Sequence, residues 1–390
     1  MSDLTSVSEV VFLSNDVDRL GGISKFMSVL GTGFFNRGMN VSFIGIEPAR
    51  EPQSYPRPEG IYTTTLYDSV PIDFIPNPDG NPELKSQNQE IKAGRSRQRQ
   101  KGVAELRKLA QNWDATTAII VTQLFAMEHF LETGIKFGIN GGPRLFGQYH
   151  DSFSAAHNRG DVRRVLGAYP QANRMLALTE HDATRFSEAG LTNVSWMPNP
   201  IDIDPNHRKN SRRKTVISMA RYHEQKSLHL LIEAWTQVAN VHPDWTLELY
   251  GEGPERVRLE SLIEKYSLQE SVKLMGMTDE AYAVMGASRI HVLSSQHEGL
   301  PLAIAEANFL GTPTVAFNCA PGVEVMTGYG EAGVLVEQNN IGQLADSLIR
   351  VMGNEELLAS FAEKAIALSG QFELSRILDG WEAEFLRASL

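Results

Sequence analysis

Residues 291–313 read HVLSSQHEGLPLAIAEANFLGTP, which predicts a strand, a polar loop and a helix in that order. The strand ends near Ser294, and Pro301 suits the first turn of a helix, where an amide hydrogen would have no partner. The helix should end at about Leu310, because a glycine and a proline follow. The exposed amides and positive dipole end of such a helix offer a binding site for a diphosphate.

The same alternation of short apolar runs and helical patterns continues along most of the chain. Apolar residues recur at helical spacing over 226–240 and 254–266, between runs that have the length of buried strands. Buried strands that alternate with amphipathic helices are typical of parallel sheets, so the predicted fold class is α/β. The predicted strands lie at 9–14, 41–46, 118–122, 144–148, 174–178, 215–219, 245–250, 271–275, 290–294 and 313–317.

Length and a break in composition divide the chain. At roughly 150 residues per domain, 390 residues suggest two or three domains. Two prolines and a run of basic residues in 199–214 mark the best boundary, which separates two α/β halves of similar size. We therefore predict domains over 1–200 and 201–370, followed by a final helix over 371–390.

The first predicted domain carries an insertion of different composition at about 48–112. Eight of the 18 prolines lie between Pro48 and Pro82, which predicts a long irregular segment on the surface. Seven basic residues and one acidic residue follow within 92–108. The second half of this basic stretch can begin a helix that runs to about Asn112.

Composition excludes several classes of protein. The formal charge of −11 argues against a general nucleic-acid binder, and Cys319, the one cysteine, excludes an internal disulfide and a cysteine-based zinc site. No apolar run reaches membrane-spanning length and no basic region begins the chain, so we expect a cytoplasmic protein. The GxxxxGK[ST], GxSxG, HExxH and intact GxGxxG motifs are absent, which weakens the ATPase, serine hydrolase, zinc protease and dehydrogenase hypotheses.

Two charged pairs lie beside predicted strand ends in the C-terminal half. Glu298 and Glu306 flank the predicted diphosphate site, where one carboxylate can bind ribose hydroxyls and the other sugar hydroxyls. Arg221 and Lys226 flank the loop after the strand at 215–219 and together suit a pyrophosphate. Taken alone, the glutamates are ordinary acids of a helix start and the cations are solvated surface charges. The surrounding sequence HEGLPLAIAEA favours a binding site.

Glycines and a histidine at other predicted strand ends have a functional and an ordinary interpretation. Gly251 and Gly253 end a strand, and Gly21 and Gly22 lie between the first predicted strand and helix. Each pair permits close approach of a ligand, and each is equally consistent with a tight turn. His150 follows another predicted strand and, without context, is more typical of a structural histidine than of a binding residue.

The C-terminal half resembles the family-4, retaining, nucleotide-sugar-dependent glycosyltransferases with the GT-B fold. Its paired glutamates have the eight-residue separation of that family. The matching segments are ARYHEQKSLHLLIEAW (220–235), LYGEGPERVRLESLI (249–263), VKLMGMTDE (272–280) and SSQHEGLPLAIAEANFLGTPTVAF (294–317). The N-terminal half matches more loosely, through Gly21-Gly22, Tyr149-His150-Asp151 and MPNPID (197–202), and the insertion at 48–112 matches no motif.

This resemblance implies two facing Rossmann-like domains with parallel sheets and an active site between them. The N-terminal domain would bind the acceptor and the C-terminal domain the nucleotide sugar. In such proteins the C-terminal helix, here 371–390, crosses back and packs on the N-terminal domain.

The resemblance also implies roles for individual residues. Arg221 and Lys226 would neutralise the donor diphosphate as it leaves, Glu306 would bind the ribose hydroxyls, and Glu298 would contact the donor sugar. His150 would lie beside the sugar and the acceptor hydroxyl. Backbone amides and close backbone approach would complete the donor site at Gly21, Gly22, Gly251, Gly253, Gly299 and Leu300, with Met277 in the loop near the nucleobase.

We therefore expect transfer of a hexose from a nucleotide diphosphate sugar, in our interpretation a UDP-sugar, to a hydroxyl with retention of configuration. The resemblance implies same-face attack in which the leaving phosphate accepts the acceptor proton. We expect no metal and no other cofactor, because protein cations would replace the metal. Two alternatives stay open: a nucleotide-sugar epimerase of the same fold, and a non-catalytic protein that binds sugar nucleotides or partner subunits.

The acceptor is expected to be a cell-envelope glycan, a polyol-phosphate polymer or a lipid-linked molecule. The basic stretch 92–108 lies in the expected acceptor domain, so a polyanionic acceptor or contact with the inner membrane surface would explain it. The alternative is that these are solvated surface charges. The sequence predicts no nucleic-acid partner and does not predict the oligomeric state.

Overall fold

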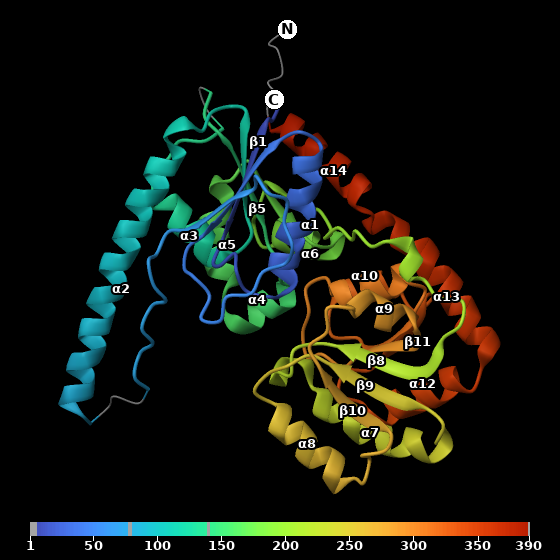
Figure 1. Ribbon diagram of the computed structural model, residues 1–390. Helices are drawn as coiled ribbons and strands as arrows, with labels where there is room; N and C mark the ends of the chain where they lie inside the picture. Colours follow the sequence, from blue (N-terminus) through green and yellow to red (C-terminus); the bar gives the residue numbers. More distant parts are fainter. Residues whose placement is uncertain (1–5, 77–79, 139–140, 389–390) are drawn as a thin grey trace. The chain divides into compact units, whose positions relative to one another are not determined.

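Two separate parallel sheets organise the chain, one in each of two units (Figure 1). The computed structural model describes residues 6–76, 80–138 and 141–388. Unit 1 comprises the described residues up to His150, then Gly160–Pro200 and the end of the chain from Leu374. Unit 2 comprises Asp151–Arg159 and Ile201–Glu373.

The sheet of unit 1 has seven strands, in the order β3-β2-β1-β4-β5-β6-β7. Every pairing between neighbours is parallel. The order reverses between β1 and β4, and in open parallel sheets ligands bind beyond the carboxyl ends of strands at such a reversal. The strands are β1 (Glu9–Ser14), β2 (Asn40–Gly45), β3 (Tyr62–Thr65), β4 (Thr117–Val121), β5 (Arg144–Gln148), β6 (Arg174–Ala177) and β7 (Val194–Trp196).

The last helix of the chain shares the core of unit 1. In α14, Trp381 and Phe385 are buried in one cluster with residues of β1 and α1. Gly33 of α1 permits this packing, because a Cβ there would lie 2.8 Å from Cδ1 of Leu378. The helices of unit 1 are α1 (Gly22–Asn36), α2 (Pro82–Leu109), α3 (Leu124–Leu131), α5 (Val162–Ala168), α6 (Glu180–Glu188) and α14 (Leu374–Arg387).

The helix α2 corrects part of the irregular insertion predicted over 48–112 and extends the helix predicted at the end of the basic stretch towards the N-terminus. It begins at Pro82, which lies in the proline-rich segment predicted to be irregular, although proline fits the first helical position. The Asn81 side chain caps the helix by accepting hydrogen bonds from the amides of Glu83 and Leu84. The 28 residues of α2 therefore form one helix, and the irregular part of the insertion precedes it.

Polar contacts, more than a buried apolar face, hold the first two thirds of α2 in place. Its buried residues, Gly102, Val103 and Leu106, all lie towards its C-terminal end. Towards the other end, Asn88 exchanges two hydrogen bonds, of 2.8 and 2.9 Å, with the backbone of Ile75.

The sheet of unit 2 has six strands, in the order β10-β9-β8-β11-β12-β13, and all its pairings are parallel. Its order reverses between β8 and β11. These two strands are followed by the two loops in which the sequence predicts charged binding residues. The strands are β8 (Arg213–Met219), β9 (Thr246–Tyr250), β10 (Val272–Gly276), β11 (Ser288–Leu293), β12 (Thr314–Phe317) and β13 (Gly333–Val336).

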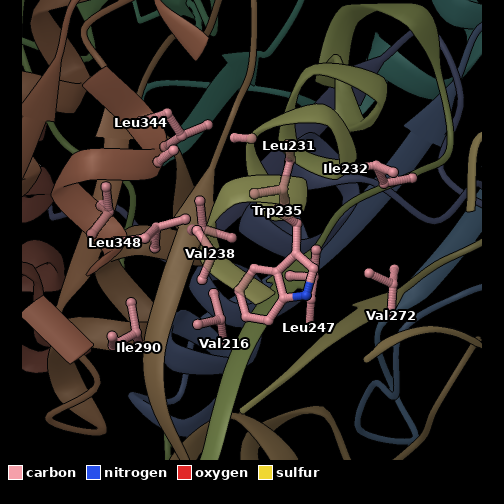
Figure 2. Close-up of a cluster of buried hydrophobic side chains, with 14 of the residues drawn as sticks. Val216, Leu231, Ile232, Trp235, Val238, Leu247, Val272, Ile290, Leu344 and Leu348 are labelled. Carbon is pink, nitrogen blue, oxygen red and sulfur yellow. The ribbon is translucent and has the colours of Figure 1, made fainter. Parts of the chain in front are cut away.

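One cluster of apolar side chains joins this sheet to its helices. Figure 2 shows Trp235 of α7 among residues of α7, α12 and the sheet. The indole is fully buried, and its Nε1 donates a hydrogen bond of 3.2 Å to Oγ of Ser271. The helices of unit 2 are α4 (Phe153–Arg159), α7 (Leu228–Val241), α8 (Arg256–Lys265), α9 (Ala281–Gly286), α10 (Leu302–Phe309), α11 (Pro321–Met326), α12 (Ile341–Met352) and α13 (Glu355–Ser369).

Three strands were not predicted from the sequence. β7 has only three residues, too few for a periodic pattern, and β3 reads YTTT within the proline-rich segment. β13 begins at Gly333, where a Cβ would lie 2.4 Å from the carbonyl oxygen of Thr314. No helix among the described residues is both long enough and apolar enough to cross a membrane.

Trp235→Ala should lower the free energy of unfolding of unit 2 by about 3–5 kcal/mol, because it empties a fully buried aromatic site. Val257 on α8 is 72% exposed, so Val257→Ala should change this free energy of unfolding by less than about 0.5 kcal/mol. Urea unfolding, followed by circular dichroism, measures both changes. Equal losses for the two variants would contradict this assignment of the core.

Candidate functional site

The predicted charged residues of unit 2 lie on the loops that follow β8 and β11 or, in the case of Glu306, on the helix α10 after the second loop. After β8, the chain forms a short 3-10 helix at Glu224–Lys226, and α7 begins at Leu228. After β11, the polar loop leads through Pro301 into α10. Because the sheet order reverses between these two strands, both loops lie at the position where open parallel sheets bind ligands.

Lys226 and Glu298 form an ion pair across the two loops. Nζ of Lys226 donates to Oε1 of Glu298 at 2.7 Å, and the two side chains are only 19% and 11% exposed. Shielding from water strengthens such a charge-assisted contact. The structure thus brings together two residues that are 72 positions apart in the sequence.

Cys319, which follows β12, lies within the electrostatic influence of this pair. Burial, with a further contribution from the negative charge of Glu298, raises the pKa of the Cys319 thiol to about 12. The thiol is therefore protonated near neutral pH and adds no negative charge beside Lys226.

A network of hydrogen bonds holds the two loops together. The backbone amide of Gln296 donates to the carbonyl of Gln225 at 2.8 Å, and Nε2 of Gln225 donates to the carbonyl of His297 at 3.0 Å. Oγ of Ser294 donates to the carbonyl of Lys226 at 2.9 Å. The positions of Lys226 and Glu298 are therefore set by backbone contacts as well as by their own ion pair.

The helix α10 carries the second predicted glutamate. Glu306 is 7% exposed, and Gly299 and Leu300, just before the helix, are also buried. No side chain caps the first turn, because Pro301 occupies the N-cap position. The amides of that turn therefore have no capping side chain, as an anion-binding helix start requires.

Two other predicted donor-site residues of unit 2 are exposed. Arg221 lies on the surface, and its guanidinium makes no ion pair with any carboxylate among the described residues. Met277 follows β10 and is 57% exposed. The structure therefore does not join either residue to the ion pair.

Gly251 and Gly253 have a structural explanation in their backbone contacts. Their φ angles are +140° and +154°, which L side chains rarely adopt. A Cβ on Gly251 would lie 2.0 Å from the carbonyl oxygen of Ala220, and one on Gly253 would lie 2.4 Å from that of Tyr222. Both glycines thus let the end of β9 pack against the loop that carries Arg221.

In unit 1, Gly21 and Gly22 lie at the start of α1. The backbone of Gly21 is extended, with φ 170°, and no atom lies within 4 Å of the position of a Cβ. No side chain caps the helix, and its first turn has no acidic residue. This helix start is open and positively polarised, as the predicted approach to a phosphate requires.

His150 follows β5 and packs against Phe26 of α1, with 4.6 Å between the ring centroids. Its Nε2 atom is buried and has no hydrogen-bond partner among the described residues. Burial lowers the pKa of His150 to about 3. The imidazole is therefore neutral near pH 7, and Nε2 can donate or accept a hydrogen bond, depending on its tautomer.

A polar contact at the reversal of the unit 1 sheet was not predicted from the sequence. Oε1 of Gln123, just after β4, accepts hydrogen bonds of 2.9 Å from Oγ of Ser14 and from the amide of Asn15. These contacts join the loops after β1 and β4. A single glutamine after a predicted strand gave no signal of partners more than 100 positions away.

Comparisons with known proteins agree with this fold. A family profile described as glycosyl transferases group 1 matches residues 201–367. An uncharacterized glycosyltransferase of Haemophilus influenzae is 32% identical over 238 residues, which make up 60% of this chain and 67% of the relative. A poly(ribitol-phosphate) α-N-acetylglucosaminyltransferase of Staphylococcus aureus is 26% identical over 211 residues, 54% of this chain and 43% of the relative.

A solved structure extends the likeness in fold to almost the whole chain. A mutant of TarM from S. aureus, in complex with fondaparinux, α-GlcNAc-glycerol and UDP, has a TM-score of 0.77 and 16% identity. The match covers 97% of this chain and all of that one. The two parallel sheets thus have the GT-B architecture of glycosyltransferases. Within that class, the chain belongs to the glycosyl transferases group 1 family.

Acid should destabilise unit 1 through His150. Its folded pKa of about 3 lies below the unfolded value of about 6.5, so its stabilisation is complete above pH 6.5 and is lost as pH falls towards 3. Below pH 6, the free energy of unfolding of the His150→Gln variant should fall by about 1.4 kcal/mol less per pH unit than that of the wild type. Urea unfolding of wild type and variant between pH 7 and 4.5 measures this. Parallel stability curves would contradict a buried neutral imidazole.

Proposed function

We propose that this glycosyltransferase moves a hexose from a UDP-sugar to a hydroxyl of a cell-envelope glycan or polyol-phosphate polymer, with retention of configuration. The observation that carries the proposal is the shielded Lys226–Glu298 pair, which lies where the unit 2 sheet reverses its strand order. The UDP present in the TarM complex supports the choice of nucleotide. The acceptor of the S. aureus relative, named as poly(ribitol-phosphate), supports the class of acceptor.

In the proposed reaction, electrostatic stabilisation provides most of the catalysis. Lys226 binds the diphosphate and stabilises the negative charge that develops as it leaves, and Arg221 on the neighbouring loop adds a second positive charge. Glu298 holds Lys226 in place and contacts the donor sugar, while Glu306 binds the ribose. The acceptor hydroxyl attacks from the face that the diphosphate leaves, and a phosphate oxygen accepts its proton.

The protein cations make a bound metal unnecessary in this mechanism. No group of three or more His, Cys, Asp or Glu side chains in the described part of the chain could hold a metal ion. We propose that the enzyme works in the cytoplasm, where nucleotide sugars are made available to it. Assays with EDTA present test the metal-independent part of the proposal.

Lys226→Ala and Glu298→Ala should each lower kcat about 10²-fold or more, because each removes a preorganised charge from the site. Lys364→Ala is the matched control, since Lys364 forms an ion pair of 2.9 Å with Glu331 on the exposed surface of the same unit. Release of UDP or GDP from a panel of donor sugars, with and without candidate acceptors, measures turnover.

Each outcome of this assay decides between functions. Acceptor-dependent release that falls in both site variants and not in the control supports the transferase. Near-native turnover of a correctly folded Lys226→Ala or Glu298→Ala variant would remove these residues from the mechanism. An epimerised sugar without nucleotide release would replace the transferase by an epimerase.

Only some of the basic residues in the stretch 92–108 are candidates for contact with a polyanionic acceptor. Within the basic stretch 92–108, Arg99 pairs with Glu132 at 2.8 Å, Lys101 pairs with Asp68, and Arg95 donates to the carbonyl of Ile72 at 2.8 Å. These three cations hold α2 to its neighbours. We therefore propose that Lys92 and Arg97, which have no such partner among the residues that the structure describes, contact an anionic acceptor.

The double variant Lys92→Gln/Arg97→Gln should weaken binding of a polyol-phosphate acceptor and reduce the salt dependence of its KM, because two exposed cations are lost. The KM for the donor should not change. Steady-state kinetics between about 50 and 200 mM salt test this. An unchanged acceptor KM and salt slope would mean that the basic stretch serves only to fix α2.

A further inference from the structure

Gln296 uses its polar groups in five hydrogen bonds to two other loops of unit 2, and the longest of them, 3.5 Å, runs from Nε2 of Gln338 to its Oε1 atom. Its backbone amide donates to the carbonyl of Gln225 at 2.8 Å, and its carbonyl accepts from Nε2 of Gln338 at 2.6 Å. Its Nε2 atom donates to Oγ of Ser227 at 2.8 Å and to Oδ1 of Asn339 at 2.6 Å. Both amide hydrogens of the side chain therefore have an acceptor.

These bonds connect three loops at the carboxyl end of the sheet. Ser227 directly follows Lys226, Gln296 lies two residues before Glu298, and Asn339 belongs to the loop between β13 and α12. The third loop contains none of the residues that the sequence predicts for binding. Gln296 joins it to the two loops that carry the members of the ion pair.

The contact with Ser227 fixes an unusual backbone conformation. Ser227 has φ 44°, in the left-handed region that a serine seldom adopts, and Lys226 immediately precedes this turn. Oγ of Ser227 donates to the carbonyl of Glu224 at 3.1 Å and accepts from Gln296. Without the Gln296 amide, this hydroxyl would lose the donor that fixes its orientation.

We propose that Gln296 is a positioning residue that holds the Lys226–Glu298 pair in register against the loop of Gln338 and Asn339. This inference rests on the proposed function, in which Lys226 stabilises the leaving diphosphate. Charges that stabilise a transition state act best when they need no rearrangement, and small displacements of such groups are costly. Residues that hold metal ligands in place from outside typically contribute about 10- to 100-fold in activity, and we expect a loss of the same order here.

Gln296→Met removes the side-chain hydrogen bonds while keeping a similar length. We expect kcat to fall about 10-fold or more while the donor KM changes by less than about 3-fold, because the charged side chains remain but are displaced. Gln296→Asn, which keeps the amide group on a shorter side chain, should recover part of kcat.

The third loop offers a second variant with little backbone strain. Asn339 has φ 64°, a conformation that glycine adopts readily, so Asn339→Gly removes the acceptor Oδ1 and keeps the turn. If Asn339 acts through Gln296, the double variant Gln296→Met/Asn339→Gly should have the kcat of Gln296→Met within about 2-fold. Multiplication of the two single effects would mean that the residues act independently.

Asn340, the next residue, provides a matched control. Its Oδ1 caps α12 by accepting from the amide of Gln343 at 2.9 Å, so Asn340→Ala should lower thermal stability. It should leave kcat unchanged, because the cap does not touch Gln296. A general loss of stability would instead lower kcat in both variants to a similar degree.

The experiment measures kcat, donor KM and melting temperature for the wild type and all five variants. A low kcat confined to the Gln296 and Asn339 variants, with a nearly unchanged donor KM, supports the inference. Wild-type kcat in Gln296→Met, or equal losses in Gln296→Met and Asn340→Ala, would overturn it. Absence of sugar transfer in the wild type itself would overturn the proposed function. This outcome differs from a failure of the inference about Gln296, because it would be seen before any substitution.

Discussion

The ion pair between Lys226 and Glu298 depends on a property of the sheet that carries it. In unit 2, the strand order reverses between β8 and β11, so the loops after these adjacent strands lead to helices that diverge from the same sheet edge. One loop supplies a cation and the other a carboxylate, and the two atoms meet at 2.7 Å. Of the other residues proposed for the site, Arg221 is exposed on the first loop and is not joined to the pair, and Glu306 lies on the helix after the second loop.

A shielded charge is useful in catalysis only if its surroundings hold it in place. The backbone contacts of Gln225 and Ser294 and the amide of Gln296 fix the two loops, and the protonated thiol of Cys319 adds no competing negative charge. In the other unit, burial keeps His150 neutral. Unit 2 thus contains a shielded charged pair, and unit 1 contains a neutral imidazole.

The α/β class and the loops that carry Lys226 and Glu298 could be predicted from the sequence, because alternating apolar runs and the HEGLP segment are local signals. The sequence predicted only the C-terminal part of α2, since Pro82 begins the helix in a region where prolines otherwise break structure. The contacts of Gln296 were not predicted, and its partner Asn339 lies 43 positions away. Long-range contacts of single polar residues leave no periodic pattern. The basic stretch was visible in the sequence, but its contacts with Glu132, Asp68 and Ile72 were not.

The most direct test of the central claim is a crystal structure of the protein with a bound UDP-sugar. The account predicts diphosphate oxygens within hydrogen-bonding distance of Nζ of Lys226, the ribose at Glu306 and the sugar beside Glu298. A nucleotide bound elsewhere, with the Lys226–Glu298 pair untouched, would contradict it.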